Sequence, residues 1–263
     1  MIIIQVKFRI SVCAKVGGGA MTYRNYINLT EKQKDTPIYR VFPVGRFIQI
    51  LTTGNLTLVK PKKWDDPFEN ILLSSKFKIG RELAEVSARD SVYGQCWTWH
   101  RETDAMWRIY SPNKDGVRVK STPRKLLESL RKSCGKFSDV QCFIGGVKYI
   151  YKKDMREKFE NINIFSTDGS GIAESLLYKR KEFSHEREVR IIYSGKDGEC
   201  ERDIFEFQID VSKTIDRVLF DPRMSEDLRR SYIEAIKSLG YKSEIKRSSL
   251  YDPPEQLTIN TSQ

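Results

Sequence analysis

The sequence has few of the residues on which metal and disulfide sites depend. Among 263 residues there are two histidines, His100 and His185, and five cysteines. The number of cysteines is odd and no two have C-x-x-C spacing, which argues against a disulfide framework and against a structural zinc site. We therefore expect no metal, and a reducing cytoplasm as the compartment.

Several common sequence signatures are also absent. The chain has neither a G-x-x-x-x-G-K loop nor a G-x-G-x-x-G loop, which cradle phosphates in many nucleotide-binding proteins, and no G-x-S-x-G hydrolase motif. No apolar run approaches the roughly 18 residues that a membrane-spanning helix needs. We expect a globular protein that does not enter a membrane.

Positive charge is what the sequence has in excess. Lys and Arg number 46 against 35 Asp and Glu, a formal net charge of +11, and the basic residues recur along the whole chain. Such a field attracts polyanions, and twelve Tyr and thirteen Phe are available for stacking on bases. The charge favours a nucleic-acid partner, although a merely solvated basic surface would have the same composition.

Short apolar segments predict more strands than helices. Expected strands are 38–42, 56–59, 93–99, 116–119, a pair within 140–151, 189–193, 205–209, 218–220 and 241–245. Expected helices are 46–51, a polar segment at 81–89, 105–110, 123–134, 173–181 and 226–239, the last with Leu228, Tyr232, Ile236 and Leu239 on one face. Because the helices do not alternate strictly with the strands, we predict an α+β fold with a mixed or antiparallel sheet and flanking helices.

The chain shows no internal repeat and no clear linker. We expect a leader or extension at 1–20, one catalytic domain at 21–251 and a flexible tail at 252–263.

Two clusters of unusual residues precede the middle of the chain. Tyr39 and Arg40 lie on an early strand, where a solvated arginine at a sheet edge is the simplest interpretation. Tryptophans then occur three times within eleven positions, in the segments C-W-T-W-H (96–100) and M-W-R-I-Y (106–110). They suit a hydrophobic core and an aromatic ligand platform equally well.

A third cluster follows at 181–190, K-E-F-S-H-E-R-E-V-R. On a strand, Glu186, Glu188 and Arg190 share one face. Two carboxylates at positions i and i+2 repel each other unless a cation or a substrate lies between them, so one of the two can have a raised pKa, as in acid–base sites. A solvated strand face with Glu–Arg pairing explains the same pattern without any function.

The order of three short motifs resembles a widespread uncharacterised bacterial family. The motifs are W-D-D-P-F-E (64–69), M-W-x-x-Y (106–110) and K-x-F-x-x-E-x-E-x-R (181–190). That family is in turn similar to the ADP-ribosyltransferases, and to RNA-modifying toxins of phage-defence toxin–antitoxin–chaperone systems. The resemblance implies an ADP-ribosyltransferase-like fold, NAD as co-substrate and no metal. It also implies a nucleic-acid acceptor, RNA in preference, with a cognate antitoxin and a chaperone as partners.

The same resemblance assigns roles to residues. Glu188 would be the acid that binds the sugar, Glu186 the proton acceptor and Tyr110 the central catalytic group. The residues that would bind NAD are Tyr39, Arg40, Trp99, Trp107 and Arg190, with Arg190 also holding the two glutamates apart.

Two other functions fit the sequence. A non-catalytic module could bind nucleic acid through the tryptophan cluster and the basic surface. A metal-dependent nuclease could use Asp65, Asp66 and Glu69 together with the late glutamates, but nothing in the sequence brings these carboxylates together.

Overall fold

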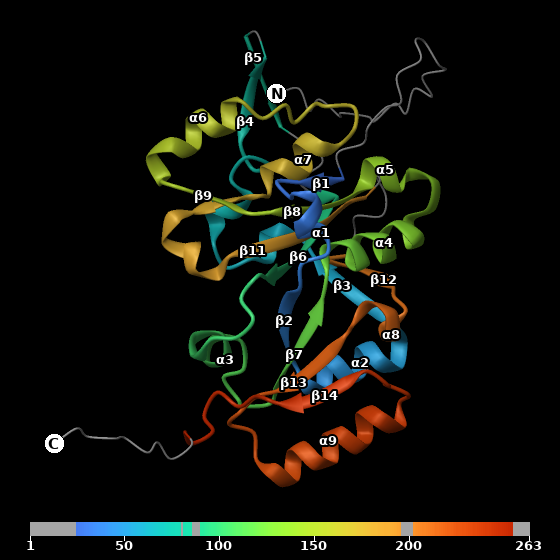
Figure 1. Cartoon of the computed structure of the whole chain (residues 1–263). Helices are drawn as coiled ribbons and strands as arrows, with labels where there is room; N and C mark the ends of the chain where they lie inside the picture. The colour runs from blue at the N-terminus through green and yellow to red at the C-terminus, as the bar shows by residue number, and fades with distance from the viewer. Residues whose placement is uncertain (1–24, 80, 86–89, 196–201, 255–263) are drawn as a thin grey trace, which may run out of the picture.

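The protein is described from a computed structural model that covers residues 25–79, 81–85, 90–195 and 202–254 (Figure 1). The expected leader at 1–20 lies outside the described residues, as does the expected tail from residue 255 onwards. No helix among the described residues is long and apolar enough to cross a membrane.

A mixed sheet of ten described strands forms the centre of the molecule. The strands along its main path run in the order β1 (Tyr26–Ile27), β8 (Cys142–Gly146), β11 (Glu188–Ser194), β6 (Val92–Thr98), β2 (Ile38–Pro43), β7 (Gly116–Ser121), β13 (Arg217–Phe220) and β14 (Glu244–Arg247). Off this path, β3 (Asn55–Val59) pairs with β6 and with β12 (Ile204–Gln208). Pairs β1–β8 and β13–β14 are parallel and the other pairs in this sheet are antiparallel, so the predicted α+β fold with a mixed sheet is confirmed.

Two small sheets stand beside the main one. Strands β4 (Lys76–Ile79) and β5 (Glu82–Glu85) pair antiparallel, and β9 (Lys148–Ile150) pairs parallel with β10 (Tyr178–Arg180). The predicted strands within 140–151 therefore exist as β8 and β9, but each pairs with a different partner.

Helices cover the sheet on both faces. They are α1 (Glu31–Lys34), α2 (Val44–Thr53), α3 (Asp104–Tyr110), α4 (Pro123–Cys134), α5 (Ser138–Gln141), α6 (Met155–Glu160), α7 (Ser170–Ser175), α8 (Val211–Thr214) and α9 (Glu226–Ser238). Short 3₁₀ helices that matter below are η2 (Pro67–Asn70), η5 (Lys152–Asp154) and η6 (Lys181–Glu186).

Local sequence signals account for two of the predicted helices, α4 and α2. Thr122 caps α4 by accepting a hydrogen bond from the Lys125 amide, and Pro123 occupies the first turn, where its missing N–H costs nothing. Gly54 ends α2 with φ 69°, a left-handed conformation that glycine adopts without strain. The apolar faces of both helices pack into the main core.

Three predictions of secondary structure were wrong. Of the expected helix at 81–89, residues 82–85 form strand β5 and residues 86–89 lie outside the described residues. The expected helix at 173–181 ends at Ser175 and is followed by strand β10. In both places pairing with a neighbouring strand supplies the backbone hydrogen bonds, and that tertiary contact outweighs helix propensity. The expected last strand at 241–245 lies later, at 244–247, because Tyr241 turns into the core and contacts Phe47.

One predicted helix face is only partly buried. Ile236 of α9 is fully buried, whereas Leu228 and Leu239 at the two ends are 42% and 41% exposed. The helix therefore packs through its middle, at Ile236, and the predicted face meets solvent at Leu228 and Leu239.

The sheet divides where β6 meets β2. These strands pair at one position, Tyr39 with Thr98, whereas β2 pairs with β7 over its whole length. Figure 1 shows the resulting upper part, with β8, β11 and β6, and the lower part, with β2, β7, β13 and β14. The place where the two parts diverge holds the cavity described next.

Candidate active site

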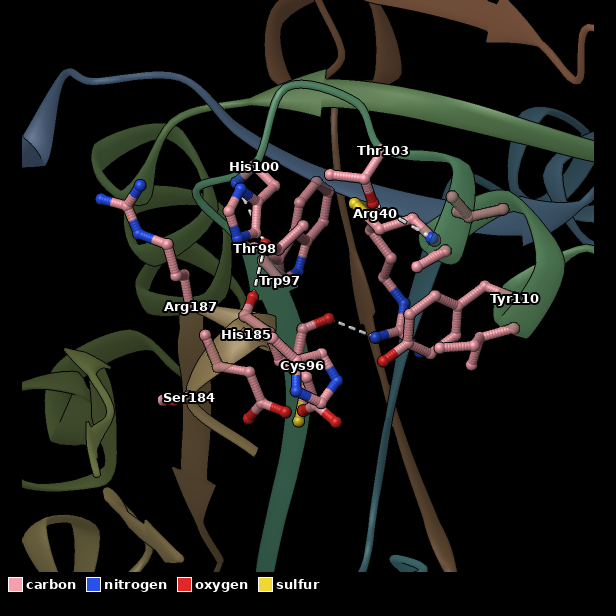
Figure 2. A pocket seen from close by; sticks show the side chains of 16 residues that line it. Arg40, Cys96, Trp97, Thr98, His100, Thr103, Tyr110, Ser184, His185 and Arg187 are labelled. Carbon is pink, nitrogen blue, oxygen red and sulfur yellow. Dashed lines mark hydrogen bonds between the residues drawn. The ribbon is translucent and has the colours of Figure 1, made fainter. Parts of the chain in front are cut away.

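A cavity of about 510 Å³ opens where β2 and β6 separate. Its lining includes Arg40 and Val41 of β2, residues 96–98 of β6, several side chains of α3, and residues 184–188, which include the end of η6 and the start of β11. In Figure 2, Arg40 and Tyr110 lie on one side of this cavity, and Ser184 and His185 lie on the other.

Glu188 is the first residue of β11 and is buried at the edge of the cavity. One carboxylate oxygen lies 2.8 Å from the Lys179 Nζ, and the other accepts a 2.7 Å hydrogen bond from the Arg190 Nε. Its backbone N–H donates a 2.8 Å hydrogen bond to the Tyr149 hydroxyl. The carboxylate is therefore held in one orientation from two sides.

Glu186 lies beside Glu188, but not on the same strand face as the sequence predicted. It ends the 3₁₀ helix η6, and Arg187, with φ 45°, separates it from the strand, so Glu186, Glu188 and Arg190 do not share one strand face. The Thr98 hydroxyl donates a hydrogen bond to the Glu186 carbonyl and holds this turn against β6. Both carboxylates nevertheless contact Lys179.

A third carboxylate completes the cluster. Glu69 of η2 is buried, with one oxygen 2.8 Å from Lys179 Nζ and the other 2.9 Å from Arg190 Nη2. Glu69 was considered from the sequence only as a possible metal ligand. The structure places it beside the late glutamates, but its charge is already paired with two cations.

The charges of this cluster explain the pKa shifts within it. Burial would raise the pKa of Glu188, but Arg190, the hydrogen bond with Glu186, and Lys179 outweigh it and hold that pKa below its usual range. Burial, together with the hydrogen bond to Glu188 and its charge, raises the pKa of Glu186 to about 8, although Lys179 opposes the rise. Three carboxylates face two cations here, and Glu186 is the carboxyl of the Glu186–Glu188 pair whose pKa is raised.

Arg190 is fully buried and lies outside the cavity lining. Its guanidinium stacks over the Trp64 ring at 4.5 Å and donates a hydrogen bond from Nη1 to the Leu176 carbonyl. The predicted contact of Arg190 with a ligand does not fit this position. Its predicted role as a partner of the glutamates agrees with its contacts to Glu188 and Glu69.

Arg40 differs from Arg190 in having no carboxylate partner among the described residues. Its Nη1 donates to the Cys96 carbonyl across the gap between β2 and β6, while its Nε is buried without a hydrogen-bond partner. Burial lowers the pKa of this arginine, and the negative charge of Glu188 is one of the effects that oppose the shift. A guanidinium is still charged after such a shift, so Arg40 brings an unneutralised positive charge to the cavity.

The predicted aromatic residues are distributed between the cavity and the core. Tyr110 lines the cavity and is 46% exposed, and burial together with Glu186 and Glu188 raises the pKa of its hydroxyl to about 12. Trp107 is 1% exposed, packs with Val41 and donates a hydrogen bond to Glu102.

Tyr39 and Trp99 lie outside the cavity lining. Tyr39 is buried beneath the Arg118 guanidinium, and Trp99 packs against the main core. The structure therefore brings together Arg40, Tyr110, Glu186 and Glu188 at the cavity, and leaves Tyr39, Trp99, Trp107 and Arg190 outside it.

Sequence reasoning missed Lys179 and Tyr149. Both lie on the small β9–β10 sheet, at paired positions of the two strands. No local signal in the sequence marks Lys179, because residues 178–180 belong to a segment whose apolar spacing predicts a helix. Arg180, next to it, pairs with Asp66 at 3.1 Å and joins this strand to η2.

The site offers neither an activated thiol nor a metal cluster. Cys96 lines the cavity, but burial and the negative charge of Glu188 raise the pKa of its thiol to about 12. That thiol is uncharged near neutral pH and is a poor nucleophile. Among the described residues, no group of three or more His, Cys, Asp or Glu is arranged to hold a metal ion.

Comparisons with known proteins found solved structures of low sequence identity and one family model that matches part of the chain. A search of curated proteins found no match. The structure of Thermus sp. 2.9 DarT in complex with carba-NAD+ is 11% identical, covers 82% of this chain and 96% of its own, and has a TM-score of 0.37. The complex of Thermus sp. 2.9 DarT with ADP-ribosylated ssDNA is 10% identical, covers 81% and 94%, and has a TM-score of 0.38. Residues 106–191 match a family model described as "Protein of unknown function (DUF2971)", and over this part the chain resembles an uncharacterised family, as predicted.

Proposed function

We propose that this protein is an ADP-ribosyltransferase that uses NAD as co-substrate and transfers ADP-ribose to a nucleic acid, RNA in preference. One observation carries the proposal: a single cavity contains both an arginine without a carboxylate partner, Arg40, and a fixed pair of carboxylates, Glu186 and Glu188. A dinucleotide with a negative pyrophosphate and a reactive sugar needs both features.

The cavity fits such a co-substrate in size and chemistry. Its volume of about 510 Å³ lies within the roughly 300–1,000 Å³ of typical ligand pockets. Arg40 lines the cavity and pairs with no described carboxylate, and a planar guanidinium pairs well with phosphate oxygens. The co-substrate also needs an apolar surface for its flat ring. Met106, Ile109 and Tyr110 of α3 provide this surface in the same cavity.

The two glutamates suit different steps of the transfer. NAD would supply the ADP-ribosyl group when its nicotinamide–ribose bond breaks. Glu188, kept ionised by Arg190 and Lys179, accepts a hydrogen bond from a ribose hydroxyl and stabilises the positive charge that develops at the sugar carbon. This interaction strengthens as the charge grows, so it lowers the barrier instead of merely tightening binding.

Glu186 takes the proton of the acceptor group. A general base is most effective when its pKa lies near the working pH, and the pKa of Glu186 is raised to about 8. Tyr110 faces both glutamates from α3 and would pack against the nicotinamide ring.

A basic surface with exposed rings supports nucleic acid as the acceptor. Lys148, Lys152 and Lys153 are exposed and form no ion pair with a described residue. Tyr151 between them is 56% exposed, and the Lys152 ammonium lies 5.1 Å from the centre of the Phe68 ring. Cations interleaved with aromatic rings bind a phosphate backbone and its bases together. The preference for RNA, the antitoxin and chaperone partners, and a role in phage defence rest on the family resemblance alone.

The test is incubation of the full chain with NAD labelled in its adenosine part, with RNA, single-stranded DNA, duplex DNA or protein offered separately. We expect label on nucleic acid, most on RNA, with one nicotinamide released per ADP-ribose transferred. Glu188→Gln should reduce the rate by about 10²–10³-fold, since it removes charge stabilisation at the reacting sugar. Glu182→Gln, an exposed glutamate of η6 outside the cavity lining, is the matched control and should keep full activity.

Three outcomes would contradict the proposal. Nucleic-acid binding without nicotinamide release or label on any acceptor would indicate a binding module. Magnesium-dependent cleavage of the nucleic acid would indicate a nuclease. Equal activity of Glu188→Gln and the wild type would remove Glu188 from the mechanism.

A further inference from the structure

Lys179 contacts every carboxylate of the site. Its side chain is 7% exposed, and its Nζ lies 2.8 Å from Glu69, 2.5 Å from Glu186 and 2.8 Å from Glu188. An ammonium group has three N–H donors, so each donor has one carboxylate. The three acceptors come from three separate segments, η2, η6 and β11.

The small β9–β10 sheet places this lysine. Lys179 is paired with Tyr149 in the parallel register of the two strands, and the Tyr149 hydroxyl accepts the backbone N–H of Glu188. The next residue, Arg180, forms two hydrogen bonds with Asp66 at the start of η2. Neighbouring residues thus tie the β9–β10 sheet to two of the three segments that carry these carboxylates, β11 and η2, and they leave Lys179 little freedom to move.

Arg190 cannot replace Lys179 in this role. Its guanidinium contacts Glu69 and Glu188, but not Glu186. Lys179 forms the one ion pair that the described residues provide to Glu186. Without it, Glu186 would keep the hydrogen bond from Thr98 to its backbone carbonyl and the hydrogen bond between its carboxyl group and Glu188, but would have no cation beside it among the described residues.

We propose that Lys179 is a positioning residue of this site, which holds the Glu186 carboxylate beside Glu188. The role rests on the proposed function, because it concerns the acid and the base of that reaction. Lys179 does not line the cavity and needs no contact with substrate.

The titratable groups around Glu186 determine how its proton affinity responds to a substitution of Lys179. Lys179 itself comes from β10, Glu188 from β11, Glu69 from η2, Tyr149 from β9 and Tyr110 from α3. Four of these five groups are acids, and the lysine is the cation among them. Its removal leaves the charged form of Glu186 less favourable, so Glu186 should then bind its proton more tightly.

The experiment compares three chains. Lys179→Arg keeps the charge but cannot place one nitrogen within reach of all three carboxylates. Lys179→Met removes the charge and would leave three buried carboxylates with one cation, so it can fail to fold. Lys179→Met combined with Glu69→Gln restores the original balance, two carboxylates with one cation instead of three with two, and separates positioning from folding.

Two readouts are needed. The first is a ¹³C NMR titration of the Glu186 carboxyl in the full chain without NAD, assigned by loss of the signal in Glu186→Gln. We expect a midpoint near pH 8 in the wild type, little change in Lys179→Arg, and a rise of about one pH unit or more in the double variant. The second is the transfer rate against pH, which should rise through the same midpoint and fall by about 100-fold in the double variant at pH 7.5.

The two readouts distinguish the possible failures. An unchanged midpoint in a folded double variant would overturn the role of Lys179, whatever the activity. If the midpoint rises in the double variant as expected but the wild type turns over no NAD, the proposed function is refuted and the positioning of Glu186 by Lys179 stands. A double variant with wild-type rate and pH profile would refute the role of Lys179 in the reaction.

Discussion

The two walls of the cavity differ in whether their cations are paired with carboxylates. The wall that Glu186 and Glu188 line is backed by η2, β10 and β11, where Lys179 and Arg190 are paired with three carboxylates at 2.5–2.9 Å. On the wall formed by β2 and α3, Arg40 has no carboxylate partner among the described residues, and Tyr110 beside it is half exposed.

The difference indicates what each wall is for. A buried cation that is fully paired holds other side chains in place, and removing it leaves uncompensated charge. A cation without an acidic partner contributes little to folding and remains available to an anionic ligand. We therefore interpret the first wall as the support of the catalytic carboxylates and the second as the surface that binds the co-substrate.

The largest effect should follow from disrupting the paired wall. Arg190→Met leaves Glu69 and Glu188 with Lys179 as their shared cation, and should lower the free energy of unfolding by about 3–5 kcal/mol. Urea denaturation with an unchanged slope is the measurement. Arg156→Met, which removes an exposed arginine of α6, should change stability by less than about 0.5 kcal/mol. Equal effects of the two substitutions would show that the buried cluster does not stabilise the fold.

A smaller effect, and on a different quantity, is expected at the unpaired wall. Arg40→Met should weaken NAD binding by about 10- to 100-fold, because charge-assisted hydrogen bonds are worth about 1.5–3 kcal/mol. Its stability should fall by no more than about 1.5 kcal/mol, the value of the single bond to Cys96. Isothermal titration calorimetry measures the affinity, with Arg108→Met on the exposed face of α3 as the control. Loss of stability without loss of affinity would reverse the assignment of this wall.

The smallest effect concerns the exposed ring. Tyr110→Ala should weaken NAD binding by about 2- to 10-fold, since a stacked ring contributes about 0.5–1.5 kcal/mol. Tyr110→Phe keeps the ring and should bind NAD as the wild type does. A loss of affinity in the Phe variant would instead show that the hydroxyl is the group in contact.

Much of the site was visible in the sequence, but not its geometry. Spacing drew attention to Glu186 and Glu188, the family resemblance selected them and Arg40 as site residues, and all three line the cavity. The same reasoning placed Trp107 with the ligand, because a tryptophan in a short helix is compatible with a core and with a platform. In the structure Trp107 is buried and packs against Val41 and Leu219, so it belongs to the core.

Lys179 shows more clearly what could not be predicted from the sequence. In the sequence it is one of 46 basic residues, in a segment whose apolar spacing suited a helix. Its importance comes from β9, which lies about thirty positions earlier and draws residues 178–180 into a strand. No local pattern reports such a pairing, because its hydrogen bonds are made between distant segments.

The sequence by itself determined the class of fold, the two capped helices α2 and α4, and the acidic segment at 186–190. These depend on short-range physics: side-chain periodicity, caps and the repulsion of nearby carboxylates. Only the tertiary structure decided that Glu69 and Lys179 join Glu188, and that Arg190 is paired while Arg40 is not. Ion pairing in a buried site depends on which distant segments meet there, and one ammonium can hold three carboxylates only after η2, η6 and β11 have been brought together.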